Sequence, residues 1–367
     1  MAEMVSSKET NSVRHVKENG NMGLLKIIAI FLIMISLYTI YRGSIGHNLP
    51  SEITELLVGI SGLGNVGVII LVLISGYNGV GDKTPFRFKN LFLVILQAVF
   101  YSVLIYLLFC ILGAAQFSML DFVGNFFPLT YDMYWLVAVF LILYIFTPYI
   151  NKLLNLLSRR SHLRLVLVMM ILFSLLPALI PHFSYGSEIV LFVMFYVIGA
   201  YFRKYRDNYF AKKRNSMLVL FITIFIVTLL MLVMGLFGSE WIVLEKGQMS
   251  LLSMRSIASI LIAISLFSVI EQMKPIASRV IDSVAGCVLG VYLMVDNYLV
   301  RRAFWKEYLG TAEYTQGPFL VLHCISSIVA VFVICVLIEL IRKYMIEKAL
   351  SRAYDSIAAK VRRHRAQ

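Results

Sequence analysis

The sequence predicts an all-α fold, that of a polytopic membrane protein with about ten transmembrane helices, and three observations support this class. Of the 367 residues, 60% are hydrophobic and only 14% are charged, whereas soluble domains carry about 25% charged residues. The mean hydropathy is +0.85, which leaves too little polar material to cover the surface of a soluble protein. Apolar runs of about 20 residues, the length that crosses a bilayer, recur along the chain. The 8 Pro, 22 Gly and 4 Cys residues exclude the disordered, collagen-like and disulfide-scaffold classes.

Ten apolar runs are candidates for spanning helices. They lie near residues 24–41, 56–77, 91–113, 134–150, 165–181, 188–202, 217–237, 251–270, 284–300 and 318–341. The second run contains Gly59, Gly62, Gly64 and Gly67, which predict a broken or closely packed helix. The fourth run carries Pro148 near its end. The runs form one transmembrane domain.

Polar segments flank this domain. Residues 1–21 predict a cytoplasmic N-terminal tail, the transmembrane domain covers residues 22–343, and residues 344–367 form a basic C-terminal tail. If the N-terminus is cytoplasmic, 27 of the 33 Lys and Arg residues fall in the inside segments. Cytoplasmic loops are enriched in these residues. We therefore expect a plasma-membrane protein with both termini in the cytoplasm. This pattern explains the net charge of +13 without nucleic acid as a partner.

The C-terminal tail has its own periodicity. Apolar residues recur at helical spacing among Arg and Lys residues, at Ile346, Ala349, Leu350, Ala353, Ile357 and Val361. A basic amphipathic helix binds the anionic lipids of the inner leaflet. A frayed tail that only supports the topology explains the same residues, and both interpretations stay open.

Known soluble catalytic motifs are absent. The sequence has no P-loop, no dinucleotide fingerprint, no nucleophile elbow and no zinc-protease motif. The six histidines lack the spacing of metal ligands. The cysteines all lie in apolar runs, where thiols act as small hydrophobic groups; they are Cys110, Cys287, Cys324 and Cys335. We expect no metal site and no disulfide.

Candidate functional residues are the polar groups at membrane depth, because such groups are costly there. Lys26 starts the first run on the inner side, and Arg255 lies inside the eighth run on the outer side. For both, the simpler interpretation is a side chain that snorkels to the interface. Asp296 lies towards the outer end of the ninth run, and Arg301 and Arg302 follow it closely. It is either a cap or interface residue, or a partner of Arg255 on another helix. His323 lies near the outer end of the tenth run, where a hydrogen-bonded interface residue is the simpler interpretation.

Aromatic residues are abundant, with 20 Tyr and 25 Phe. Tyr131, Tyr134 and Trp135 lie together at the entrance of the fourth run. Tyr and Trp are enriched at membrane interfaces. We interpret this group as part of an interfacial aromatic belt.

Several segments resemble one known family in order and spacing. They are Leu24–Tyr38, Gly67–Tyr77 with its final S-G-Y, Met133–Leu154, Phe195–Tyr205, and Leu289–Asn297 with the sequence L-G-V-Y-L-M-V-D-N. Together they resemble the acyltransferase-3 family of bacterial integral membrane acyltransferases, over almost the whole chain. The resemblance implies transfer of an acyl group from cytoplasmic acyl-CoA to a hydroxyl of an envelope glycan or similar acceptor. It implies acyl-CoA as a donor substrate and no bound cofactor.

The resemblance also implies which positions should carry the chemistry. A family histidine on the first helix is thought to act as base, because a sugar hydroxyl is a poor nucleophile until its proton is removed. A basic residue about three turns earlier helps to bind the donor. Here the basic position falls on Lys26, but the histidine position falls on Leu37. A second family histidine, in the ninth run, falls on Val295, followed by Asp296 and Asn297. Both expected imidazoles are therefore missing.

Three hypotheses stay open. The first is an acyltransferase with a substitute base, Asp296 or His323, in which Lys26 and Arg255 bind the donor or stabilise charge. The second is a catalytically degenerate family member that binds a glycan or a lipid-linked precursor and assists assembly. The third is a carrier of an envelope precursor, which ten spans with Arg255 and Asp296 permit but which lacks the inverted repeat common in transporters.

Overall fold

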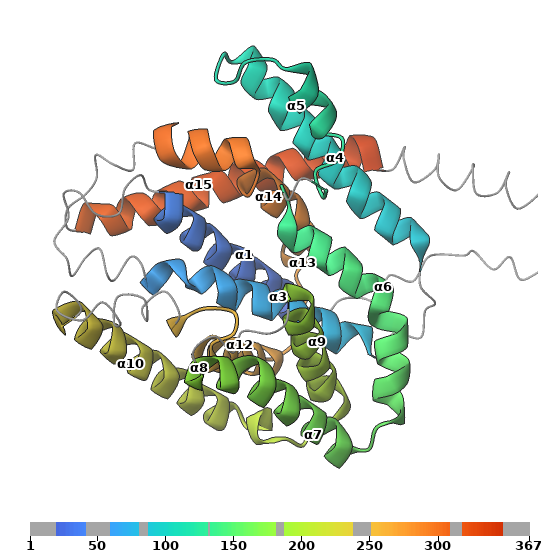
Figure 1. Cartoon of the computed structure of the whole chain (residues 1–367), viewed down its shortest axis with the longest axis vertical. Helices are drawn as coiled ribbons and strands as arrows, with labels where there is room; N and C mark the ends of the chain where they lie inside the picture. Colours follow the sequence, from blue (N-terminus) through green and yellow to red (C-terminus); the bar gives the residue numbers. More distant parts are fainter. Residues whose placement is uncertain are drawn as a thin grey trace, which may run out of the picture.

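The computed structural model describes residues 20–41, 59–80, 87–130, 133–180, 187–237, 251–308 and 318–347. Every regular element in these ranges is a helix, so the all-α prediction is confirmed (Figure 1). Most of the predicted N-terminal tail and most of the C-terminal tail lie outside the described residues, and residues 20–21 of the former begin α1.

Within the described residues, seven helices are long and apolar enough to cross a membrane. Five of them are the single helices α1 (Gly20–Tyr41), α3 (Leu63–Gly79), α4 (Phe88–Ile111), α6 (Trp135–Leu156) and α10 (Lys213–Phe237). One is formed by three consecutive elements, α7 (Arg159–Met170), η1 (Ile171–Leu175) and α8 (Leu176–Leu179). The last is α15 (Pro318–Arg342), which continues into η5 (Lys343–Glu347). These helices match seven of the ten predicted runs. The chain is therefore a multi-pass membrane protein by the length and composition of its helices.

The other three predicted runs form shorter elements, so a count of ten spans is not confirmed. The sixth run is α9 (Glu188–Lys204), and the eighth is α12 (Ile257–Glu271), which begins only at Ile257 because Ser256 caps it. The ninth run is divided into α13 (Arg279–Ala285), α14 (Val288–Val295) and η4 (Val300–Tyr308). Breaks therefore fall at residues 286–287 and 296–297.

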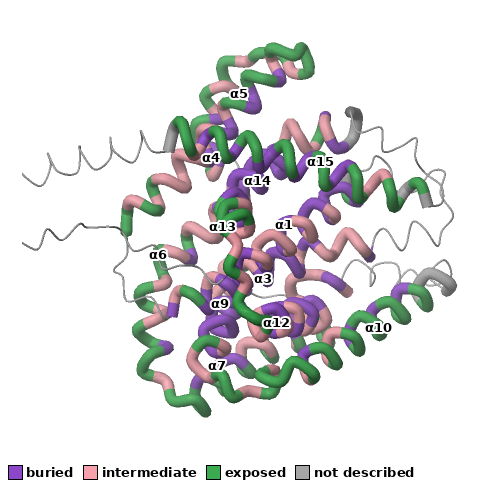
Figure 2. Tube along the Cα trace, turned by 180° about the vertical axis from the view of Figure 1, so that it is seen from behind, coloured by how far each residue is buried: buried purple, intermediate pink, exposed green. Residues whose placement is uncertain are grey.

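The centre of the bundle is formed where α3 packs between α1 and α9, and most of its residues are buried (Figure 2). A Cβ atom on Gly67 would meet the backbone of Ala29 on α1, and one on Gly76 would meet the backbone of Tyr196 on α9. The two glycines therefore let three helices approach closely. Gly62 forms a turn directly before α3. These observations agree with the predicted close packing of the second run.

The peripheral helices expose apolar side chains over much of their length, as the green segments of α6, α7 and α10 show (Figure 2). In a bilayer these faces contact lipid chains. Pro148 lies inside α6 as the sequence indicates. Two short elements complete the description, α5 (Met119–Gly124) after α4 and η2 (Tyr209–Ala211) before α10.

Candidate functional site

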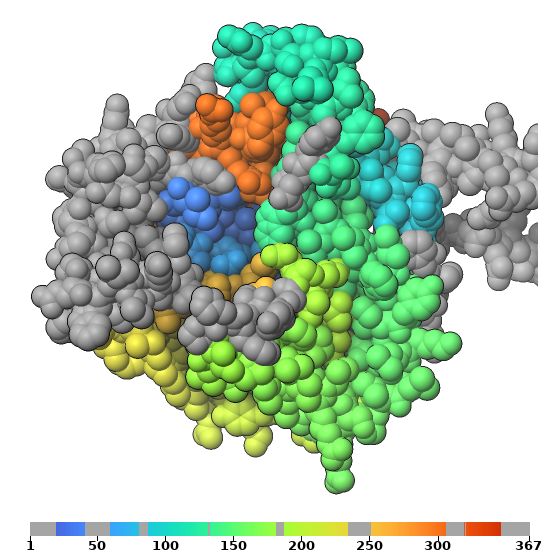
Figure 3. Space-filling view, viewed as in Figure 1, coloured from blue at the N-terminus to red at the C-terminus, as the bar shows by residue number. Residues whose placement is uncertain are grey.

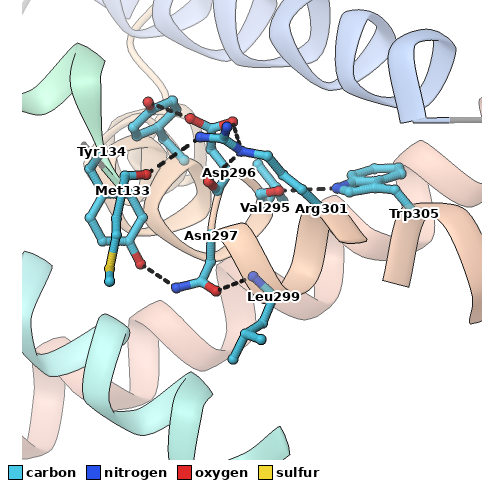
Figure 4. Close-up of polar contacts among 9 residues, drawn as sticks. Met133, Tyr134, Val295, Asp296, Asn297, Leu299, Arg301 and Trp305 are labelled. Carbon is cyan, nitrogen blue, oxygen red and sulfur yellow. Dashed lines mark hydrogen bonds and ion pairs between the residues drawn. The ribbon is translucent and has the colours of Figure 1, made fainter. Parts of the chain in front are cut away.

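The polar cluster at the C-terminal end of α14 is built around Asp296, which is 5% exposed and caps the helix. Its Oδ1 atom lies 3.0 Å from Nε of Arg301, and its Oδ2 atom accepts a hydrogen bond of 2.6 Å from the hydroxyl of Tyr292 (Figure 4). Nε of Arg301 also donates to the carbonyl of Asp296 at 2.8 Å. Arg301 thus places a cation at the C-terminus of the helix, where the helix dipole favours it.

Residues at the same break also form hydrogen bonds with the start of α6. The side-chain amide of Asn297 donates to the hydroxyl of Tyr134 at 2.9 Å and accepts from the backbone N–H of Leu299 at 3.0 Å (Figure 4). Arg301 donates to the carbonyl of Met133 at 3.4 Å. Tyr134 is fully buried. Its assignment to an interfacial belt was therefore wrong, because its hydroxyl has a partner inside the protein. We call Tyr134, Tyr292, Asp296, Asn297 and Arg301 the Asp296 cluster.

A second polar contact joins α1 to α15. Nδ1 of His323 lies 2.8 Å from the hydroxyl of Tyr38, which follows directly after Leu37. The indole of Trp305 meets the ring of Tyr38 edge-on, with 6.5 Å between centroids, and donates to the carbonyl of Val295 at 3.0 Å. Trp305 thus links the Tyr38–His323 pair to the end of α14. We call this side of the bundle the Tyr38 end.

The predicted positions of the site divide between the two ends of the bundle. Leu37 is 7% exposed and Val295 is 1% exposed, so both aliphatic side chains belong to the core. Asp296 and His323 both lie at the Tyr38 end. Lys26 precedes Tyr38 by 12 residues on α1, which is about 18 Å along a helix axis.

Arg255 lies near the Tyr38 end. It lies three residues after Leu252, whose carbonyl accepts a hydrogen bond of 2.8 Å from Asn65 near the start of α3. Gly64, the residue before Asn65, packs on Ser36 of α1. Lys26 and Arg255 are therefore separated along the bundle. Within the described residues, the ion pair of Asp296 is formed with Arg301 and not with Arg255.

A buried carboxylate that the sequence interpretation missed lies near the C-terminal end of α15. Glu339 is fully buried and accepts two hydrogen bonds from Arg342, at 2.8 and 2.9 Å. It also accepts from the hydroxyl of Tyr101 at 2.6 Å and from Gln97 at 3.1 Å, both on α4. We call these residues the Glu339 cluster. The sequence held one signal for this cluster: the acidic residue Glu339 is followed three residues later by the basic residue Arg342, and residues at this spacing are neighbours on a helix.

A third polar group lies where α3, α9 and α12 end together. The hydroxyl of Tyr77 donates to Glu271 at 2.7 Å, and the guanidinium of Arg203 lies 5.0 Å above the ring of Tyr77. Beside them is a cavity of about 120 Å³, whose lining includes Arg206, Ser268 and Glu271. Pockets for drug-sized ligands measure about 300–1,000 Å³. This cavity therefore accommodates only one end of such a ligand.

Metal and disulfide chemistry find no support in the described part of the chain. No group of three or more His, Cys, Asp or Glu residues there is arranged to hold a metal ion. The four cysteines all lie within the described residues and form no disulfide with one another. The arrangement instead offers an imidazole, a paired carboxylate and cations, which are the groups of acid–base chemistry.

The comparisons with known proteins give one match. A family model described as an acyltransferase domain matches residues 19–340, from the start of α1 to the last turn of α15. No curated protein and no solved structure matches the chain.

Proposed function

Because the chain belongs to the acyltransferase-3 family, we propose that it transfers an acyl group from acyl-CoA to a hydroxyl of an envelope glycan or similar acceptor, with His323 as general base. The observation that supports this most strongly is the contact of 2.8 Å between His323 Nδ1 and the hydroxyl of Tyr38. It brings an imidazole from α15 to the turn of α1 that carries Leu37, where the family resemblance leads us to expect a histidine.

The proposed step uses the imidazole to remove the proton of the acceptor hydroxyl as its oxygen attacks the thioester carbonyl. The new ester bond forms, the carbon–sulfur bond breaks, and the proton passes from the imidazolium to the leaving thiolate. The role of Tyr38 is to hold the ring in position through its hydroxyl. Negative charge that develops on the carbonyl oxygen needs a nearby cation, a role that we assign to Arg255.

Asp296 is less suited to act as the base. One carboxylate oxygen is paired with Arg301 and the other accepts from Tyr292. Taking up a substrate proton would displace one of these partners. We assign Asp296 to holding the break after α14, beside the proposed base.

The proposed topology places the Tyr38 end outside the cell and the Lys26 end at the cytoplasm of a plasma-membrane protein with both termini inside. Lys26 then lies on the side from which acyl-CoA arrives, and so does the cavity beside Glu271, because Lys and Arg residues concentrate in the segment 203–214 next to it. The proposed contact of the C-terminal tail with anionic lipids concerns residues that are mostly outside the described ranges.

The test is the ester content of the envelope. Cells that lack the gene should lose an acyl ester from a surface polymer, as measured by mass spectrometry. Wild-type protein and Asp296→Asn should restore the ester, whereas His323→Gln at equal membrane abundance should not. Restoration by His323→Gln to the wild-type level would reject the proposed base.

A degenerate family member is the second candidate, and the buried aliphatic residues Leu37 and Val295 favour it. Such a protein binds a glycan or a lipid-linked precursor without transferring an acyl group. It predicts an unchanged ester profile on deletion, together with a defect in envelope assembly that His323→Gln and Asp296→Asn both repair. A defect that neither variant repairs would contradict it.

A further inference from the structure

The connection between α4 and α6 lies in a segment that the charge pattern assigns to an outer loop, yet it folds back along α4. The hydroxyl of Tyr106 accepts from the backbone N–H of Ser118 at 2.8 Å and donates to its carbonyl at 3.0 Å. Further along, the hydroxyl of Ser102 donates to Asn125 at 2.7 Å. The connection therefore runs antiparallel to the last turns of α4.

These contacts fix the depth of the connection. Tyr106 and Ser102 lie five and nine residues before the last residue of α4, Ile111. At 1.5 Å per residue, Ser118 and Asn125 lie about 8 and about 14 Å back along the helix axis. The 24 residues of α4 span about 36 Å, somewhat more than the hydrocarbon core of about 30 Å. In Figure 1, α5 lies beside the end of α4, at the edge of the bundle.

The connection also projects sideways from the bundle (Figure 3) and exposes apolar side chains. Leu120 is 81% exposed, and Phe117, Met119, Val123 and Phe126 are exposed as well. The last turns of α4 also expose apolar side chains, a row of leucines and Ile111. At 100° per residue, Asp121 points roughly 150° away from the mean direction of Met119, Leu120 and Val123.

The backbone of the connection is suited to a medium without water. The N–H groups of Gly113, Ala114 and Ala115 donate to the last carbonyls of α4, and those of Phe126, Phe127 and Thr130 donate to carbonyls three residues earlier. Unsatisfied backbone groups are costly in hydrocarbon, so these hydrogen bonds lower the cost of placing the two turns there.

We propose that residues 112–130 form a re-entrant hairpin whose apolar face is buried among lipid acyl chains, in the leaflet at the Tyr38 end. The occupant of this face is the bilayer, because its exposed side chains are apolar and the hydrogen bonds to Tyr106 and Ser102 place the connection level with the last turns of α4. The hairpin meets the Asp296 cluster through Met133 and Tyr134, so it borders the proposed site from the membrane side. The proposal does not depend on acyltransferase activity.

The test uses the full chain in phosphatidylcholine–phosphatidylglycerol vesicles. A spin label is attached at Leu120→Cys after the native cysteines are replaced, and collisions are measured with oxygen, which concentrates in lipid, and with a water-soluble nickel chelate. Leu104→Cys on the exposed side of α4 is the matched lipid control, and Asp207→Cys, with a fully exposed side chain, is the water control.

We expect the labels at Leu120 and Leu104 to have similar ratios of oxygen to nickel collisions. Both ratios should be at least tenfold higher than the ratio at Asp207. A label that collides with nickel as often as Asp207 does would overturn the proposal, and protection from both reagents would assign the face to a protein contact instead. Because removal of buried cysteines can impair folding, Leu120→Trp with all cysteines kept provides a second measurement. Brominated lipids should quench its added fluorescence, and no added quenching would equally reject the hairpin.

Discussion

The Asp296 and Glu339 clusters both consist of a buried carboxylate paired with an arginine a few residues later, but they differ in their surroundings. Glu339 lies within a continuous helix, and its oxygens accept from Arg342, Tyr101 and Gln97. Asp296 lies at the break after α14, and its partner Arg301 keeps 23% of its side chain exposed. A carboxylate at membrane depth is therefore no sign of chemistry by itself. The position of Asp296 beside a helix break, which Trp305 links to the Tyr38–His323 pair, distinguishes the candidate site.

The two clusters are connected by α14. A Cβ atom added to Gly290 would overlap the carboxylate carbon of Glu339, and Asp296 caps the other end of the same short helix. The Glu339 cluster thus fixes the start of α14, and the Asp296 cluster fixes its end. Substitutions in the two clusters should separate stability from activity.

The largest loss of stability is expected from Glu339→Ala. It leaves Arg342 buried without its anion, and breaking a buried pair from one side costs about 3–5 kcal/mol. Thermal unfolding in detergent, followed by fluorescence-detected size exclusion, measures the change. The double variant Glu339→Leu with Arg342→Met should recover most of the loss, because it leaves no buried charge. Equal stability of the single variant and the wild type would show that the cluster does not support the fold.

Gly290→Ala should have the next largest effect. Its methyl group would overlap the carboxylate of Glu339, which is held by several partners and has little freedom to move, so overpacking of about 1–3 kcal/mol is expected. Gly286→Ala is the matched control, because the nearest atom to its Cβ is the flexible amine of Lys343 at 2.9 Å. Melting temperatures of the two variants are compared. A smaller decrease for Gly290→Ala than for Gly286→Ala would contradict the packing of α14 on Glu339.

Asp296→Asn should cost less than Glu339→Ala, about 1–2 kcal/mol, because Arg301 is partly hydrated and still bonds the carbonyl of residue 296. Acyl transfer should stay within about tenfold of the wild type, since the carboxylate is not the proposed base. Turnover and melting temperature are measured on the same preparation. A loss of acyl transfer of a thousandfold with an intact fold would make Asp296 the base.

The smallest change in stability is expected from Tyr38→Phe, about 1 kcal/mol for one lost hydrogen bond. The maximal rate of acyl transfer should fall clearly while the melting temperature changes little, because the imidazole of His323 loses the group that orients it. The comparison is between the maximal rate and the melting temperature of this variant. An unchanged rate would show that Tyr38 does not position His323.

Sequence patterns predicted the all-α class, seven of the spans and the close packing of α3, because hydropathy reports how much apolar surface a run of residues has. The same measure could not locate the breaks around α14, since residues 286–287 lie within a run that stays apolar. It placed His323 near an end of its helix but could not identify Tyr38, 285 residues away in the chain, as its partner. Glu339 was missed because one acid does not interrupt a long apolar run, and Tyr134 was misassigned because its partner Asn297 is distant in sequence.

The most direct test of the proposed base is the rate at which the purified chain in vesicles consumes acyl-CoA in the presence of an acceptor polymer, with His323→Gln compared with Asp296→Asn. The account predicts that His323→Gln retains its fold and loses about 10²–10⁴-fold of the rate, the usual contribution of a general base, while Asp296→Asn remains close to the wild type. Equal rates for His323→Gln and the wild type would contradict it.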